Sequence, residues 1–150
     1  MAKEASIGAI EKPEENGDPD ATTGGPHVER KGGRMSPRMV NHPFPDIIRK
    51  LPEASIAQRG VRGWISQGKN HQIVFFEIAP TAKIPDHVHG AQWGIVVDGE
   101  MELTIDGITR TYEKGCFYYI PDGAVHSAVF KTRTFALDFF ANGNRYQIKA

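Results

Sequence analysis

The chain has 150 residues, and its 18 lysine and arginine side chains balance 18 aspartate and glutamate side chains, so the formal net charge is zero. A neutral chain offers no electrostatic basis for binding nucleic acid or an anionic membrane surface. It has no apolar run long enough to cross a membrane and no signal-peptide pattern at its start. Its single cysteine excludes an intramolecular disulfide. We therefore expect a soluble, cytoplasmic protein with neither nucleic acid nor membrane as a partner.

The first part of the chain differs in composition from the rest. Residues 1–40 contain no aromatic residue and are interrupted by four prolines and two Gly-Gly pairs. Such a segment cannot bury enough apolar surface to offset the entropy that it loses on ordering. We predict a disordered or irregular extension over residues 1–43, to which the sequence assigns no function, and one domain over residues 44–150.

From residue 44 onward, short strand-like runs alternate with turn residues. The expected strands are 61–66, 72–79, 93–98, 100–106, 108–112, 116–120, 125–130 and 134–140. Within them, Met101, Leu103 and Ile105 alternate with polar residues, and Asp106-Gly107 is a two-residue hairpin signal. Many short strands without helical periodicity between them predict an all-β fold, either an antiparallel sandwich or a small barrel.

Three histidines and one glutamine are the most informative residues. His87 and His89 are two residues apart, so in an extended strand both side chains project from the same face. Two neutral imidazoles on one face form half of a metal site. A third imidazole from another strand, His126, and an oxygen donor, Gln92, would complete the site and leave positions open for water or substrate.

The same residues lie in two motifs that resemble those of the cupin family, whose members are small jelly-roll β-barrels. The first family motif is His-x-His, a short gap, Glu, six residues and Gly, and the second is Gly, five residues, Pro-x-Gly, two residues and His. This chain has His87-Val88-His89, Gln92 and Gly99 for the first motif, and Gly115, Pro121, Gly123 and His126 for the second.

The resemblance, which extends over residues 83–130, implies a single cupin-type antiparallel β-barrel, also described as a double-stranded jelly roll. It further implies one divalent transition metal ion in the mouth of the barrel, held by His87, His89, Gln92 and His126. Zinc, nickel, iron and manganese are all compatible with three imidazoles and one amide oxygen.

Gln92 stands where the family usually has glutamate, and it follows His89 after only two residues. A neutral amide oxygen leaves the full charge of the ion on the site, so the ion is a stronger Lewis acid. This change favours lyase, isomerase or hydrolytic chemistry over oxygen activation. The alternative is that Gln92 does not touch the metal and hydrogen-bonds a bound water or a ligand imidazole.

Asp138 and Tyr118 are the candidate catalytic residues. Asp138 interrupts an apolar run over residues 135–140. If the even-numbered positions of that strand face the cavity, Asp138 is a buried carboxylate near the metal and a candidate general base. If the odd-numbered positions face inward, it is a solvated edge charge. The sequence leaves both interpretations open, and Tyr118 is explained equally well by core packing or by a role in proton transfer.

Ile73, Phe75, Phe117 and Tyr119 alternate with the presumed core positions. They predict an apolar outer face, which is typical of an interface, and we therefore expect a homodimer.

The preferred function is that of a metal-dependent enzyme of the isomerase or lyase type, whose ion polarises a carbonyl group. Its expected substrate is a small, polar, oxygen-rich molecule such as a sugar acid. Two alternatives stay open: an iron-dependent dioxygenase that uses the same three histidines, and a non-catalytic module that binds a metal or a small ligand. Analogy at the level of the fold does not name the substrate, because one fold supports many chemistries.

Overall fold

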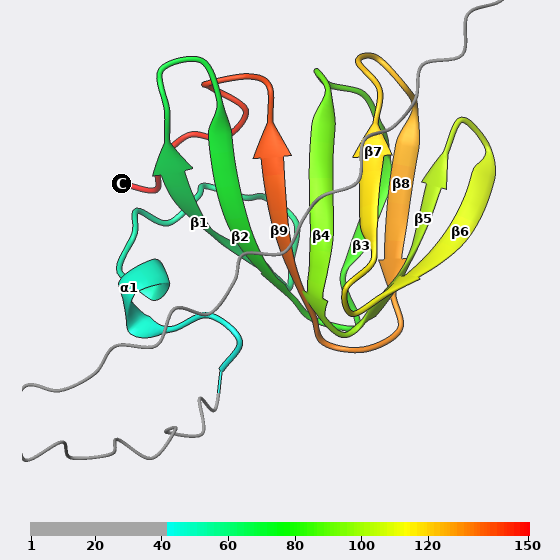
Figure 1. The fold of residues 1–150 in the computed structure, drawn as a ribbon, viewed down its shortest axis with the longest axis horizontal. Coiled ribbons are helices and arrows are strands. Elements are labelled where there is room, and N and C mark those ends of the chain that lie inside the picture. The colour runs from blue at the N-terminus through cyan, green and yellow to red at the C-terminus, as the bar shows by residue number, and fades with distance from the viewer. Residues whose placement is uncertain (1–41) are drawn as a thin grey trace, which may run out of the picture. The chain divides into compact units, whose positions relative to one another are not determined.

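The computed structural model describes residues 42–150 (Figure 1). The predicted extension over residues 1–43 therefore lies almost entirely outside the described residues. Within the described part there are one short helix and nine strands. These are α1 (Asp46–Arg49), β1 (Val61–Gln67), β2 (Gln72–Ile78), β3 (Lys83–His87), β4 (Gln92–Asp98), β5 (Glu100–Ile105), β6 (Ile108–Glu113), β7 (Phe117–Ile120), β8 (His126–Phe130) and β9 (Thr134–Phe140). The all-β prediction is confirmed.

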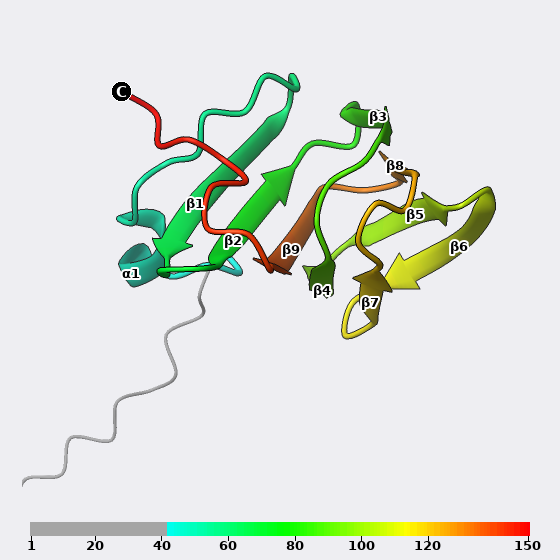
Figure 2. The same cartoon turned by 90° about the horizontal axis from the view of Figure 1, so that it is seen from above.

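The strands form two antiparallel sheets that face each other as the walls of a sandwich (Figure 2). One sheet has five strands in the order β1-β2-β9-β4-β7, and the other has four in the order β3-β8-β5-β6. Six of the eight connections between consecutive strands pass from one sheet to the other, so strands distant in sequence become neighbours. This is the predicted double-sheet jelly roll.

Local sequence signals account for most of the element boundaries. Asp106 and Gly107 both have positive φ angles, 47° and 79°, and they connect β5 to β6 as the predicted two-residue turn. Glycine and aspartate are suited to that turn because it holds both central residues in the left-handed region. The strand that carries His87, β3, ends at that residue, so His89 follows the strand instead of lying within it.

The main core fills the space between the sheets. Alternate residues of β2 are buried, as are Met101 and Leu103 of β5, because period-two alternation turns one side of each strand toward the opposite sheet. Val74, Val96 and Ile120 are almost completely excluded from solvent.

A second, smaller cluster covers part of the outer face. Phe44 precedes α1 and packs against Trp64 and Phe135, with ring centroids 6.2 and 5.7 Å from its own, and it is only 2% exposed. It also packs edge-on against Phe75, at 5.5 Å. The predicted apolar outer face is therefore divided: the chain itself covers Phe75 on β2, while Phe117 on β7 remains 69% exposed.

Within residues 42–150, no helix has the length and apolar character needed to span a membrane.

Candidate metal centre

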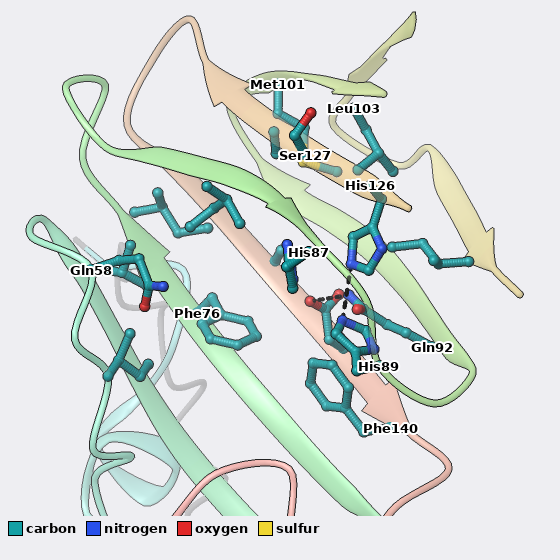
Figure 3. A pocket seen from close by; sticks show the side chains of 18 of the residues that line it. Gln58, Phe76, His87, His89, Gln92, Met101, Leu103, His126, Ser127 and Phe140 are labelled. Carbon is teal, nitrogen blue, oxygen red and sulfur yellow. Dashed lines mark hydrogen bonds between the residues drawn. The ribbon is translucent and has the colours of Figure 1, made fainter. Parts of the chain in front are cut away.

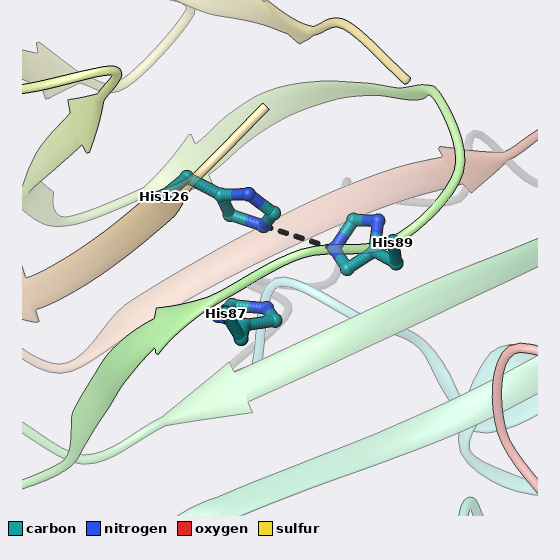
Figure 4. Close-up of side chains that lie close together, drawn as sticks. All are labelled: His87, His89 and His126. Atoms are coloured by element: carbon teal, nitrogen blue, oxygen red, sulfur yellow. Dashed lines mark hydrogen bonds between the residues drawn. The ribbon is translucent and has the colours of Figure 1, made fainter. Parts of the chain in front are cut away.

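The structure brings His87, His89 and His126 together where β3 ends and β8 begins (Figure 4). His87 at the end of β3 is directly opposite His126 at the start of β8 in the antiparallel register, and their ring centroids lie 4.1 Å apart. His89 lies on the connection after β3, with its ring 4.5 Å from that of His126. One nitrogen from each ring lies within 4.8 Å of the other two. The predicted convergence of the three imidazoles is thus observed.

Each imidazole is oriented by a backbone carbonyl. The Nδ1 atoms of His87, His89 and His126 lie 2.9, 2.7 and 2.9 Å from the carbonyl oxygens of Pro85, Gly90 and Ala124. A carbonyl oxygen only accepts hydrogen bonds, so the proton of each neutral ring must be on Nδ1. The Nε2 atom of each ring therefore carries a lone pair.

These lone pairs face one another. The Nε2 atoms of His89 and His126 are only 2.9 Å apart, and with both ring protons on Nδ1 no proton lies between them. Burial lowers the pKa of His89 to about 4 and also lowers the pKa of His126, so both rings are neutral at neutral pH. A cation that accepts these lone pairs would relieve the repulsion between them.

The three histidines consequently fit a divalent transition metal. Imidazole nitrogen is a preferred ligand of zinc, nickel, iron and copper ions. In metal sites the second ring nitrogen of a ligating histidine is usually bonded to a carbonyl or carboxylate, which fixes the tautomer, and all three histidines already have such a bond.

Gln92, Asp138 and Tyr118 form a buried network beside the histidines. The Gln92 amide Nε2 donates to Asp138 Oδ2 at 2.8 Å, and the Tyr118 hydroxyl donates to Asp138 Oδ1 at 2.5 Å. All three residues line the same cavity as the histidines; Figure 3 shows Gln92 close to them. The even-numbered positions of β9 therefore face the cavity, and Asp138 is a buried carboxylate instead of a solvated edge charge.

The environment of Asp138 changes its acidity. Burial raises the pKa of its carboxyl group to about 7, although the hydrogen bonds from Tyr118 and Gln92 act in the opposite direction. Burial, together with the neighbouring Asp138 charge, raises the pKa of the Tyr118 hydroxyl well above its usual value. The carboxyl group can thus exist in either protonation state near neutral pH, whereas the hydroxyl keeps its proton.

Gly94 makes room for this network. It lies opposite Asp138 in the register of β4 with β9, and opposite Tyr118 in that of β4 with β7. A Cβ atom at this position would overlap the Asp138 carboxylate and the Tyr118 ring, well inside the 3.0 Å below which a neighbour must shift. The absence of a side chain at Gly94 therefore lets the carboxylate and the phenol meet inside the sheet.

The histidines and the Asp138 network share a cavity of about 190 Å³. Its remaining lining is mainly apolar, with Phe76, Met101 and Leu103 among the side chains visible in Figure 3. A concave, largely apolar site with a few convergent polar groups suits a small molecule. Sequence reasoning missed two further lining residues, Arg145 and Tyr146, because they lie in a polar segment after the last strand and belong to no motif.

A protein-family model described as a cupin domain matches residues 74–140. Among solved structures, an RmlC-like cupin from Shewanella frigidimarina is similar over 65% of this chain and 87% of its own, with 22% identity and a TM-score of 0.58. KdgF from a Halomonas species is similar over 61% of this chain and 86% of its own, with 23% identity and a TM-score of 0.55. A variant of oxalate decarboxylase from Bacillus subtilis is similar over 64% of this chain but only 28% of its own, with 19% identity and a TM-score of 0.56. No curated protein matches the sequence. At these identities the solved structures show a shared fold.

Proposed function

We propose that this chain, whose residues 74–140 match a family model described as a cupin domain, is a metal-dependent enzyme of the isomerase or lyase type that acts on a small, oxygen-rich substrate. The observation that carries this proposal is the set of three carbonyl-oriented imidazoles, whose Nε2 lone pairs converge without a proton between the closest two. His87, His89 and His126 would hold one divalent transition metal ion. When bound, the ion would supply Lewis acidity toward a substrate carbonyl.

Gln92 is the proposed fourth ligand. Its amide nitrogen is engaged by Asp138, so its amide oxygen points away from that carboxylate and is the atom available to a cation. In this arrangement Asp138 would not bind the ion itself, but it is hydrogen-bonded to Gln92, the residue that would. The negative charge of Asp138 would thus polarise the Gln92 amide while the ligand atom itself stays neutral.

Asp138 is the proposed proton-transfer group. It is the only carboxylate among the described residues that line the cavity. A buried carboxylate in contact with substrate would remove a proton from the carbon atom next to a carbonyl group. It would then return that proton to another atom of the substrate. The hydroxyl of Tyr118 fixes one carboxylate oxygen, and through that oxygen it would hold the other in position. The placement of the carboxylate inside the cavity supports this assignment.

The metal proposal is tested by binding stoichiometry. Chelator-treated protein is titrated with Zn²⁺ and Mn²⁺ by calorimetry, for the wild type and for His87→Ala, His126→Ala and His71→Ala. His71 is a matched control because it stacks on Phe139 at the outer surface and does not line the cavity. We expect one metal per chain in the wild type and the His71 variant, and loss of binding in the other two. Equal binding in all four proteins would refute the proposed site.

The catalytic proposal is tested without knowing the natural substrate. Metal-loaded protein is incubated in D₂O with a panel of uronates, aldonates and 2-keto acids, and proton NMR follows the loss of the signal next to the carbonyl. We expect exchange with at least one compound, its abolition in Asp138→Asn, and slower exchange in Tyr118→Phe. Oxygen consumption by the ferrous protein without such exchange would instead identify oxygen chemistry. Binding with neither reaction would identify a non-catalytic module.

A further inference from the structure

Arg145 carries a buried polar atom with no hydrogen-bond partner. Its Nε is inaccessible to solvent, and it is the only such unpartnered side-chain nitrogen or oxygen among the described residues. Arg145 lines the cavity of the three histidines, and it is the only arginine or lysine of residues 42–150 that does so. A buried N–H group without an acceptor is unfavourable, so this atom marks a position at which an acceptor is missing.

The segment that carries Arg145 is firmly anchored. The side chain of Gln72, which is 1% exposed, donates from Nε2 to the carbonyl of Tyr146 and accepts at Oε1 from the backbone N–H of Tyr146, both at 2.9 Å. On the other side of Arg145, the carbonyl of Gly143 accepts a hydrogen bond from the Gln67 amide at 2.8 Å. Arg145 is therefore held over the cavity by contacts on both sides of its position in the chain.

The guanidinium group is stacked in a way that leaves its hydrogen-bonding edge unused. Its carbon lies 4.5 Å from the ring centroid of Tyr146 and 5.8 Å from that of Phe140. Stacking occupies the faces of the planar group, whereas its N–H donors project in the plane. No described residue forms a salt bridge with it.

We propose that Arg145 binds the carboxylate of an anionic substrate, whose other oxygens face the three histidines. One planar guanidinium matches one carboxylate through two parallel hydrogen bonds, and the Nε–H is one of the donors that this geometry uses. A single cation in a cavity that also contains the Asp138 carboxylate suits a singly charged group better than a phosphate. The proposal names the substrate class of the site and so rests on the proposed function. Arg145 and Gln72 lie outside the segment that matches the family model.

Nitrogen-15 NMR tests this proposal directly, because the Nε–H groups of arginines give separate signals. The Arg145 signal is assigned by its absence from Arg145→Lys, and chelator-treated wild-type protein is titrated with acetate and with acetamide as its neutral counterpart. We expect a saturable downfield shift of the Arg145 signal with acetate, none with acetamide, and no shift of Arg110, an exposed arginine on β6. No saturable shift, or equal shifts for both probes, would overturn the proposal. Stronger binding of inorganic phosphate than of acetate would overturn the choice of carboxylate.

A second measurement connects the arginine to larger substrates. The affinities for D-glucuronate and D-glucose, which differ by one carboxylate, are compared by calorimetry for the Zn²⁺-loaded wild type, Arg145→Gln and Arg110→Gln. We expect Arg145→Gln to weaken glucuronate binding about tenfold or more and to leave glucose binding within about twofold. A preference for glucuronate that survives in Arg145→Gln would refute the assignment. Because the NMR titration uses metal-free protein, failure of the metal site would not alter its outcome.

Discussion

Replacing Gly94 with alanine is the most direct way to test the buried network beside the histidines. The added Cβ would overlap the Asp138 carboxylate and the Tyr118 ring. Strand β4 lies between β9 and β7 in the sheet, so its backbone cannot move aside without breaking both ladders. The carboxylate must move instead, and it then loses hydrogen bonds from Tyr118 and Gln92 while it stays buried.

The size of the effect follows from those contacts. A hydrogen bond to a charged group contributes about 1.5–3 kcal/mol, and overpacking of a filled core costs about 1–3 kcal/mol. Partial relaxation makes these costs overlap, so we expect Gly94→Ala to lower the free energy of unfolding by about 3 kcal/mol. For a domain of this size, about 4 °C of melting temperature corresponds to each kcal/mol, which gives a decrease of about 12 °C.

Urea denaturation of chelator-treated protein, followed by tryptophan fluorescence, measures this loss. Gly90→Ala is the matched control, because its φ is not in the left-handed region and a Cβ there would meet only Asp122 Oδ1, at 3.8 Å. The control should stay within about 0.5 kcal/mol of the wild type. A loss below about 1 kcal/mol in Gly94→Ala, or an equal loss in the control, would refute the inferred packing of the carboxylate.

Three further predictions concern charge and assembly. In metal-free protein, the lowered pKa of His89 makes stability rise between about pH 4 and 6.5, whereas the raised pKa of Asp138 makes it fall between about pH 4 and 7. Asp138→Asn removes only the second effect, so between pH 4.5 and pH 7.5 its free energy of unfolding should rise by about 3 kcal/mol relative to that of the wild type in urea denaturation; a difference independent of pH would contradict the raised pKa. Gln92→Glu replaces the donor to Asp138 with a second carboxylate, and should destabilise metal-free protein by about 2 kcal/mol while tightening Zn²⁺ binding in calorimetry; unchanged stability would contradict the observed hydrogen bond. The exposed apolar face around Phe117 predicts a homodimer that Phe117→Ser converts to a monomer, as measured by light scattering; a monomeric wild type would exclude this interface.

The parts of the fold that depend on local patterns could be predicted from the sequence. Alternation along residues 100–105 and the Asp106-Gly107 turn define a hairpin without reference to the rest of the chain. The spacing of the two histidine motifs likewise predicted which imidazoles meet, because the motifs include the turns that present them.

Features that depend on pairing between distant strands could not be predicted in this way. The orientation of Asp138 is fixed by its register opposite Val74 on β2 and Gly94 on β4, and a shift of one residue would have turned it outward. Phe44 covers Phe75 through an aromatic contact between positions about thirty residues apart. No local sequence pattern specifies that contact. Arg145 gave no signal at all, since a single arginine after the last strand usually has no specific role.

The double hydrogen bond between Gln72 and Tyr146 determines where this protein can be shortened. A chain cut after Phe140, where the family match ends, would keep every histidine. It would also remove both hydrogen bonds between Gln72 and Tyr146: Nε2 of Gln72 would still donate to Gln67 Oε1, but its Oε1 would be left inside the fold without a donor. Such a truncated chain should fold poorly although it retains the entire histidine cluster. The smallest unit suitable for expression or for grafting into another protein therefore extends beyond the last strand, through Tyr146.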